Sequence, residues 1–284
     1  MRWSDLGRSG NLDDERGASG GGGGGMGFGK LGLGGIAIVV VIALITKQNP
    51  LALLQQVSGD DPTATAPASP VDDASQEREM RFISFVLDTT QATWRQVLPA
   101  AGHQWRDAKL VVFRDRFASA CGAADAASGP FYCPSDEKVY LDLAFYDELK
   151  TRFGAPGEFA QAYVLAHELG HHVQKVLGTE ARVRAEMEQH PEQRNRLSVQ
   201  LELQADCFAG VWAHTAAKEG IVNSADIDDG LRAAASVGDD RLQRMGGGAI
   251  HPESWTHGSS EQRSTWFRRG FDTGTVSACE TSRG

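Results

Sequence analysis

The pattern of apolar positions predicts an amphipathic helix over residues 156–178. Apolar side chains recur there at steps of three and four, which places them on one face of an α-helix: Phe159, Tyr163, Ala166, Leu169, Val173 and Val176. Tyr163 could therefore face a cleft, although an aromatic residue at this spacing more often belongs to the core. A Pro-Gly pair before the segment and Gly178 after it are typical of helix boundaries.

A second helix is predicted over residues 196–218, where one side is apolar and Gly220 follows the end. Residues 139–143 and 110–113 instead have the patterns of short β-strands. Either could be an edge strand to which an extended peptide adds, or both could be core strands. Together these elements predict an α+β fold that is mostly helical and contains a small β-sheet.

The first quarter of the chain differs from the rest. Residues 1–25 are polar and glycine-rich, whereas residues 26–46 carry one charge, Lys30, and an unbroken apolar run over residues 36–45. This length suffices to span a bilayer, and the lack of an amphipathic face disfavours a buried helix. A cleaved signal peptide is the other alternative, but the charged region before the run is unusually long for one. An uncleaved transmembrane anchor in the lipid bilayer fits best.

The basic residues around this run predict its orientation. Four basic residues precede the run, whereas Lys47 is the only one between it and Arg78. The positive-inside rule therefore places the N-terminus in the cytoplasm. Residues 47–75, rich in Ser, Thr, Pro, Ala and Asp, are predicted to be a disordered stalk. Residues 76–284 are then a domain outside the cytoplasm, on the periplasmic or cell-wall side of a bacterial membrane.

Composition narrows the possible partners. The chain of 284 residues is acidic, with a formal net charge of −9, and 41% of its residues are hydrophobic, which is enough to bury a core. After the first quarter, Arg268 and Arg269 are the only adjacent basic residues. No basic surface is therefore indicated, and nucleic acid is not expected as a partner.

Four cysteines lie in the predicted domain, at positions 121, 133, 207 and 279. A domain outside the cytoplasm permits disulfides, and of the three connectivities we favour Cys121 with Cys133 and Cys207 with Cys279. Isolated buried thiols are the alternative. A cysteine zinc site is disfavoured, because no two cysteines have the separation of two to four residues that is usual for such sites.

The candidate chemistry centres on the sequence His-Glu-Leu-Gly-His that begins at His167. Two histidines four residues apart project from one face of a helix, so His167 and His171 are candidate zinc ligands. Glu168 is the candidate general base for a zinc-activated water. Gly170 has low helix propensity, but a small residue there could let another backbone or the metal approach. His172 points about 100° away from His171 and is predicted to support the site or to face solvent.

A third ligand is predicted on the second helix, which carries Glu202 and Asp206 four residues apart. Helix carboxylates are most often solvated, but here a nearly uncharged run over residues 207–212 indicates a buried helix. A buried carboxylate needs a partner or a metal. We therefore assign Glu202 as a zinc ligand and Asp206 as the acceptor of a hydrogen bond from a ligand histidine.

This helix pair resembles the gluzincin class of zinc peptidases, whose third ligand is a downstream Glu. The Glu-x-x-Ala-Asp sequence from Glu202 is similar to that of membrane metallopeptidases such as the CAAX prenyl endopeptidases and their bacterial heat-shock relatives. Those enzymes carry Thr-His-Pro with an Arg six residues after the His, and here a Thr-His-Gly sequence places His257 six residues before Arg263. The departure from that pattern is Gly258, which stands where proline is usual.

The resemblance implies that His257 and Arg263 stabilise the oxyanion that forms when a peptide carbonyl is attacked. Residues 259–262 predict a helix start with a capping box, so that His257 lies just before the helix and Arg263 in its first turn. An exposed loop histidine and a salt-bridging arginine are the alternative roles.

The most extensive resemblance is to a bacterial family of neutral zinc metallopeptidases, and it covers nearly the whole chain. It is carried by the Met-Arg-Trp start, the Phe-Tyr-Cys-Pro sequence at residues 131–134, the histidine helix and Gln-Ala-Asp-Cys at residues 204–207. We therefore predict a membrane-anchored zinc endopeptidase with a zincin-like fold that cleaves protein or peptide substrates. The alternative is a zinc-stabilised binding or scaffolding domain at the membrane. The intact Glu168 argues against it, because a structural zinc site needs no such carboxylate.

Overall fold

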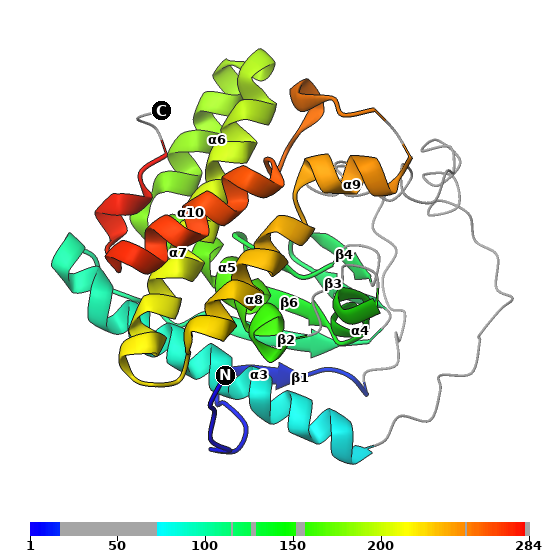
Figure 1. Ribbon diagram of the computed structural model, residues 1–284, viewed down its shortest axis with the longest axis vertical. Helices are drawn as coiled ribbons and strands as arrows, with labels where there is room; N and C mark the ends of the chain where they lie inside the picture. Colours follow the sequence, from blue (N-terminus) through cyan, green and yellow to red (C-terminus); the bar gives the residue numbers. More distant parts are fainter. Residues whose placement is uncertain (18–72, 115, 126–128, 152–156, 248, 282–284) are drawn as a thin grey trace, which may run out of the picture.

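The computed structural model describes residues 1–17, 73–114, 116–125, 129–151, 157–247 and 249–281. In these ranges helices predominate around a small mixed sheet, which confirms the predicted α+β class (Figure 1). The helices are α3 (Asp73–Val97), α4 (Ala144–Thr151), α5 (Glu158–Leu177), α6 (Thr179–Gln189), α7 (Arg194–Lys218), α8 (Ser224–Ser236), α9 (Asp239–Met245) and α10 (Ser260–Thr273). Short 3₁₀ turns cover Leu98–Ala101, Pro191–Gln193, Pro252–Ser254 and Val276–Cys279. The strands are β1 (Leu12–Asp14), β2 (Lys109–Phe113), β3 (Arg116–Ser119), β4 (Gly122–Asp125), β5 (Phe131–Cys133) and β6 (Lys138–Asp142).

The predicted transmembrane anchor at residues 26–46 lies outside the described ranges, as does nearly all of the predicted stalk. Among the helices that are described, none combines the length and the apolar character needed to cross a membrane. Helix α3 begins at Asp73, slightly before the predicted domain boundary at residue 76.

The larger sheet has four strands in the order β1-β2-β6-β5. Strands β1, β2 and β6 run parallel, and β5 is antiparallel to β6. Strands β3 and β4 form a separate hairpin. The two predicted strands are β2 and β6. Both lie in the interior of the four-stranded sheet, so neither is the edge strand that the sequence allowed as one alternative. The edges are β1 and β5.

The main core forms between the sheet and the helices. Alternate residues of a strand point to opposite faces, so Leu110 and Val112 of β2 share one face with Val139 and Leu141 of β6. These side chains are buried in one cluster with residues of α3 and α5. Helix α5 is therefore packed firmly against the rest of the domain, which gives the histidine sequence a rigid support.

Helix α7 packs against both α5 and α10. The crossing with α10 is close because glycines face each other there. A Cβ atom added to Gly210 would lie 2.1 Å from the Phe267 carbonyl oxygen, and one added to Gly270 would lie 1.9 Å from the Cys207 carbonyl oxygen. Larger residues would therefore separate the two helices.

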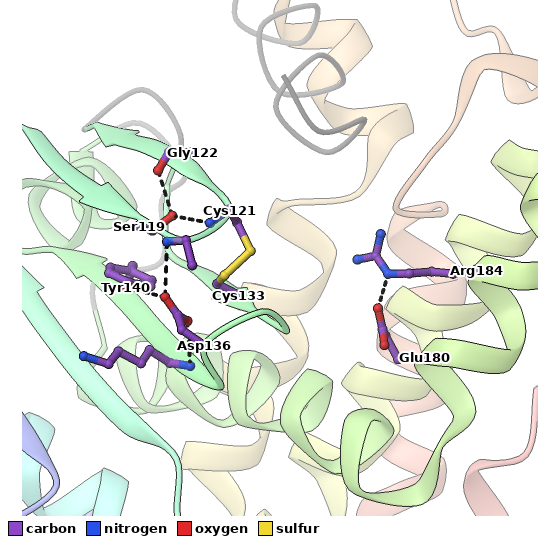
Figure 2. The surroundings of a disulfide bond; sticks show 10 residues. Ser119, Cys121, Gly122, Cys133, Asp136, Tyr140, Glu180 and Arg184 are labelled. Carbon is purple, nitrogen blue, oxygen red and sulfur yellow. Dashed lines mark hydrogen bonds and ion pairs between the residues drawn. A yellow bond between two sulfur atoms is a disulfide. The ribbon is translucent and has the colours of Figure 1, made fainter. Parts of the chain in front are cut away.

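The two predicted disulfides are both present, and no cysteine is free. The first joins Cys121, in the turn between β3 and β4, to Cys133 at the end of β5 (Figure 2). The second joins Cys207 of α7 to Cys279, which lies in the last 3₁₀ turn. Each bridge therefore fixes an element that also contributes to the site described below.

Residues 1–17 belong to the folded domain, which corrects the predicted separation of a cytoplasmic segment 1–25 from the domain. Strand β1 pairs with β2, and the segment lies beside α3 (Figure 1), where Ser9 donates a hydrogen bond to Asp88. Two of the basic residues that predicted the orientation form ion pairs within the domain: Arg8 pairs with Asp14 and Glu77, and Arg16 pairs with Asp14. The sequence did not indicate strand β1, because a three-residue strand that joins an existing sheet needs no apolar pattern of its own.

Candidate active site

The histidine sequence lies in the second half of α5, where α7 crosses it closely. A Cβ atom added to Gly170 would lie 2.9 Å from the carbonyl oxygen of Ala205, a residue of α7. The prediction that a small residue at position 170 lets another backbone approach is therefore confirmed. The helix ends at Gly178, whose φ of 74° is a left-handed conformation that glycine adopts without strain.

His167, His171 and Glu202 form the group of potential metal ligands found among the described residues. Their ligand atoms all lie within 4.8 Å of one another. A Glu202 oxygen lies 3.2 Å from Nε2 of His167, and the other lies 3.6 Å from Nε2 of His171. Donor atoms of a tetrahedral zinc with bonds near 2.0–2.1 Å lie about 3.3 Å apart. The spacing of the three groups therefore fits zinc.

The Nδ1 atoms of His167 and His171 each lie close to a hydrogen-bond acceptor, which determines the tautomer of each ring. Nδ1 of His167 lies 2.9 Å from Asp206 Oδ1, and Nδ1 of His171 lies 2.9 Å from Gln174 Oε1. The Gln174 amide nitrogen donates to the Leu201 carbonyl, which leaves its oxygen free to accept from His171. In its neutral form each histidine would therefore carry its proton on Nδ1 and leave the Nε2 lone pair for a metal ion held together with Glu202. Metal-binding histidines are typically oriented in this way.

Asp206 is fully buried and is held by Arg263 as well as by His167. Arg263 Nε lies 2.8 Å from one carboxylate oxygen of Asp206 and Nη2 lies 2.9 Å from the other, a bidentate pair. Tyr163 also donates to Asp206 through its hydroxyl. Burial raises the pKa of Asp206, but Arg263 and His167 outweigh it and hold that pKa below its ordinary value.

This pairing gives Arg263 a different place from the one that the resemblance implied. Its guanidinium pairs with Asp206, which in turn contacts His167, so Arg263 is joined to a potential metal ligand through Asp206. The alternative role, a salt-bridging arginine, fits this position, and the ion pair between Arg263 and Asp206 is buried. Tyr163 is likewise a core residue that also has a polar contact with the site.

His257 lies just before α10 and interacts electrostatically with the potential ligand Glu202. Its Nδ1 lies 3.1 Å from Asp239 Oδ1, while Asp239 Oδ2 accepts hydrogen bonds from the backbone N–H groups of Thr256, His257 and Gly258. Burial lowers the pKa of His257, but Asp239 and the charge of Glu202 together raise it. The helix start is as predicted, with a capping box between Ser259 and Gln262.

Gly258, which stands where the Thr-His-Pro sequences that it resembles have proline, has a φ of 93°. Proline fixes φ near −65° and could not adopt this conformation. The left-handed turn at Gly258 also allows its N–H to donate to Asp239. Glycine at this position is therefore explained by the local loop conformation.

Glu168 lies beside the ligands without being one of them, and only 8% of its surface is exposed. Burial raises the pKa of Glu168 to about 7, while His167 and a hydrogen bond from the Tyr132 backbone oppose this shift. A carboxyl group with a pKa near neutrality can both take up and release a proton under physiological conditions.

Three supporting residues escaped sequence analysis: Gln174, Asp239 and Tyr132. Gln174 follows His171 by three residues, a helical neighbour that could have been found from spacing alone. Asp239 and Tyr132 come from distant segments, and only the fold brings them to the site. His172 is fully buried, so the prediction that it supports the site fits, and the solvent-facing alternative is wrong.

The chain belongs to the family described as "Putative neutral zinc metallopeptidase", whose model matches residues 1–282. This agrees with the resemblance found in the sequence, and zinc is the metal that the family description and the ligand cluster both indicate.

Two relatives illustrate how far the similarity extends. The uncharacterized protein YpfJ of Escherichia coli K12 is 43% identical over 285 residues, which cover 99% of this chain and 98% of that protein. The uncharacterized protein Rv2575 of Mycobacterium tuberculosis H37Rv is 40% identical over 205 residues, or 68% of this chain and 67% of that protein. No solved structure matches the chain.

Proposed function

We propose that this chain is a zinc-dependent endopeptidase that hydrolyses peptide bonds in protein or peptide substrates. One observation carries the proposal: buried Glu168 stands beside a cluster of three potential ligands and is not itself part of that cluster. Structural zinc sites usually have four protein ligands, whereas catalytic sites have three and keep one position open. Three ligands with an adjacent carboxyl group therefore favour catalysis.

When bound, zinc supplies a Lewis acid that polarises the substrate carbonyl and lowers the pKa of water. The proton transfers fall to Glu168, whose carboxylate accepts the proton of the attacking water and then gives it to the leaving amine. Asp239 and Glu202 raise the pKa of His257 and so favour its doubly protonated form, in which Nδ1–H binds Asp239 and Nε2–H can donate a hydrogen bond to the developing oxyanion. Asp206 and Gln174 hold the two ligand histidines in the required tautomer throughout.

The test compares the purified full chain with its Glu168→Gln variant on a peptide library, with and without a chelator. The variant should keep its zinc and lose about 10²–10⁴-fold in kcat/KM, because it lacks the proton acceptor. Glu158→Gln, in the first turn of the same helix, is the matched control and should retain activity. Undiminished hydrolysis by zinc-loaded Glu168→Gln would refute the mechanism. Bound zinc without hydrolysis by the wild-type chain would instead favour the scaffolding domain.

We also propose that the described domain, including residues 1–17, lies outside the cytoplasm and at a membrane. Two disulfides support this, because they persist in oxidising compartments, and the apolar sequence of residues 26–46 supports membrane contact. All native cysteines are paired, so a cysteine introduced at Glu186, an exposed position on α6, would be the one free thiol. It should react with a membrane-impermeant maleimide in spheroplasts, and reaction only after lysis would contradict the proposed compartment.

A further inference from the structure

One turn of α5 presents two pairs of side chains to different neighbours. His167 and His171 are four residues apart and face Glu202 of α7. Glu168 and His172 are also four apart, so they too lie on one side of the helix, about 6 Å apart along its axis. Both contact the same residue of β5, Tyr132.

The contact with His172 involves the Tyr132 hydroxyl, and its direction is determined. Nε2 of His172 lies 2.8 Å from the Arg106 carbonyl oxygen, which can only accept, so Nε2 carries the proton. Nδ1 of His172 is therefore an acceptor, and the Tyr132 hydroxyl, 2.8 Å away, donates to it. His172 is fully buried and packs against the edge of Trp105, which fixes its ring.

The contact with Glu168 involves the backbone of Tyr132, whose N–H donates a hydrogen bond to the carboxylate. Strand β5 is an edge strand with three residues, and it pairs with β6 on one side only. So short a strand would move easily on its own. It is held by the Cys121–Cys133 disulfide immediately after Tyr132, and by the Tyr132 hydroxyl bond to α5 (Figure 2 shows the disulfide).

We propose that Tyr132 is a positioning residue for Glu168: its backbone N–H orients the carboxylate, and its hydroxyl bond to His172 fixes the strand against α5. The proposal rests on the proposed function, since orientation of Glu168 matters only if Glu168 transfers protons. It also gives a role to two features that the mechanism leaves unused, the histidine that follows the zinc-binding sequence and the Phe-Tyr-Cys-Pro sequence at residues 131–134.

The physical reason is that a glutamate side chain has several rotatable bonds and could occupy positions away from the attacking water. One fixed N–H donor removes part of that freedom, and displacement of a catalytic group by about 1 Å can lower a rate by about 100-fold. Because the donor is a backbone group, no side-chain substitution removes it directly. Its position can be changed through the hydroxyl of Tyr132 or through His172.

The main test is Tyr132→Phe, which keeps the ring, the strand and the disulfide but removes the hydroxyl. We expect kcat to fall about 10-fold or more, with zinc content unchanged. Tyr140→Phe on the adjacent strand β6 is the matched control, because its hydroxyl binds Asp136, away from α5. The control should keep the wild-type kcat. Equal values for the two variants would overturn the proposal.

A second measurement does not depend on activity. Hydrogen exchange of the Tyr132 amide in the metal-free protein should be slow in the wild type and faster in Tyr132→Phe, His172→Gln and Glu168→Ala. Unchanged exchange in Tyr132→Phe overturns the proposal whatever its kcat. If the wild-type chain hydrolyses no peptide, the proposed function fails, whereas the exchange data still report whether Tyr132 holds Glu168.

The double variant Tyr132→Phe/His172→Gln tests whether the two residues act together. If the hydroxyl bond transmits the effect, the double variant should be no slower than the slower single variant. Multiplied losses in kcat would contradict this coupling and leave the two residues with separate roles.

Discussion

Helix α5 contacts chemically different groups on its two sides. Toward α7, the helix meets charged groups that are buried and paired, with Glu202 between the two histidines and Asp206 held by Arg263. Toward β5, it meets a neutral phenol and a backbone N–H from a three-residue strand. The first side can hold a metal and the second can orient a carboxylate. Zinc binding and proton transfer are therefore supported by different neighbours of α5, although the residues for both lie close together on that helix.

The largest expected effect comes from Glu202→Gln, which removes a ligand on the α7 side. Zinc affinity should fall by more than the roughly 10–100-fold that is typical of losing a residue behind the ligands, and peptide hydrolysis should disappear with the zinc. Titration with a zinc indicator measures the affinity. Glu168→Gln is the comparison, because it should bind zinc as the wild type does. An equal loss of zinc affinity in both variants would contradict the assignment of zinc binding to the α7 side of α5 alone.

A smaller effect on zinc is expected from Asp206→Asn, about 10–100-fold in affinity, with a large effect on stability. The variant leaves Arg263 buried without its charged partner, which typically costs about 3–5 kcal/mol in the free energy of unfolding. Chemical denaturation of the metal-free protein measures this cost. Asp272→Asn, at an exposed position of α10, is the control and should unfold like the wild type. A stability change below about 1 kcal/mol in Asp206→Asn would contradict the assigned pairing.

The stability difference between the wild type and Asp206→Asn should depend on pH. The folded protein holds the pKa of Asp206 below its ordinary value of 3.8, because Arg263 and His167 outweigh the effect of burial. A carboxyl group whose pKa is lowered on folding contributes stability above its unfolded pKa and loses that contribution as the pH falls below it. The stability difference between the wild type and Asp206→Asn should therefore shrink below a pH of about 3.8.

The helices, the inner strands, the disulfide pairs and the metal cluster were predictable because each depends on local spacing or on a small number of combinations. The ligands could be predicted because the two helices that carry them have recognisable sequence motifs: His167, His171 and Glu202. Strand β1 was not predictable, since its pairing depends on the edge that β2 offers. The position of Arg263 was also missed, because the close crossing of α7 and α10 decides which group it meets. The backbone donor at Tyr132 leaves no trace in the sequence.

Strand β1 determines which compartment an N-terminal tag would report. Because β1 and β2 share hydrogen bonds, residues 12–14 and 109–113 lie in one sheet. Two paired strands cannot be on opposite sides of a membrane. An N-terminal tag would therefore report the compartment of the sheet that supports the active site.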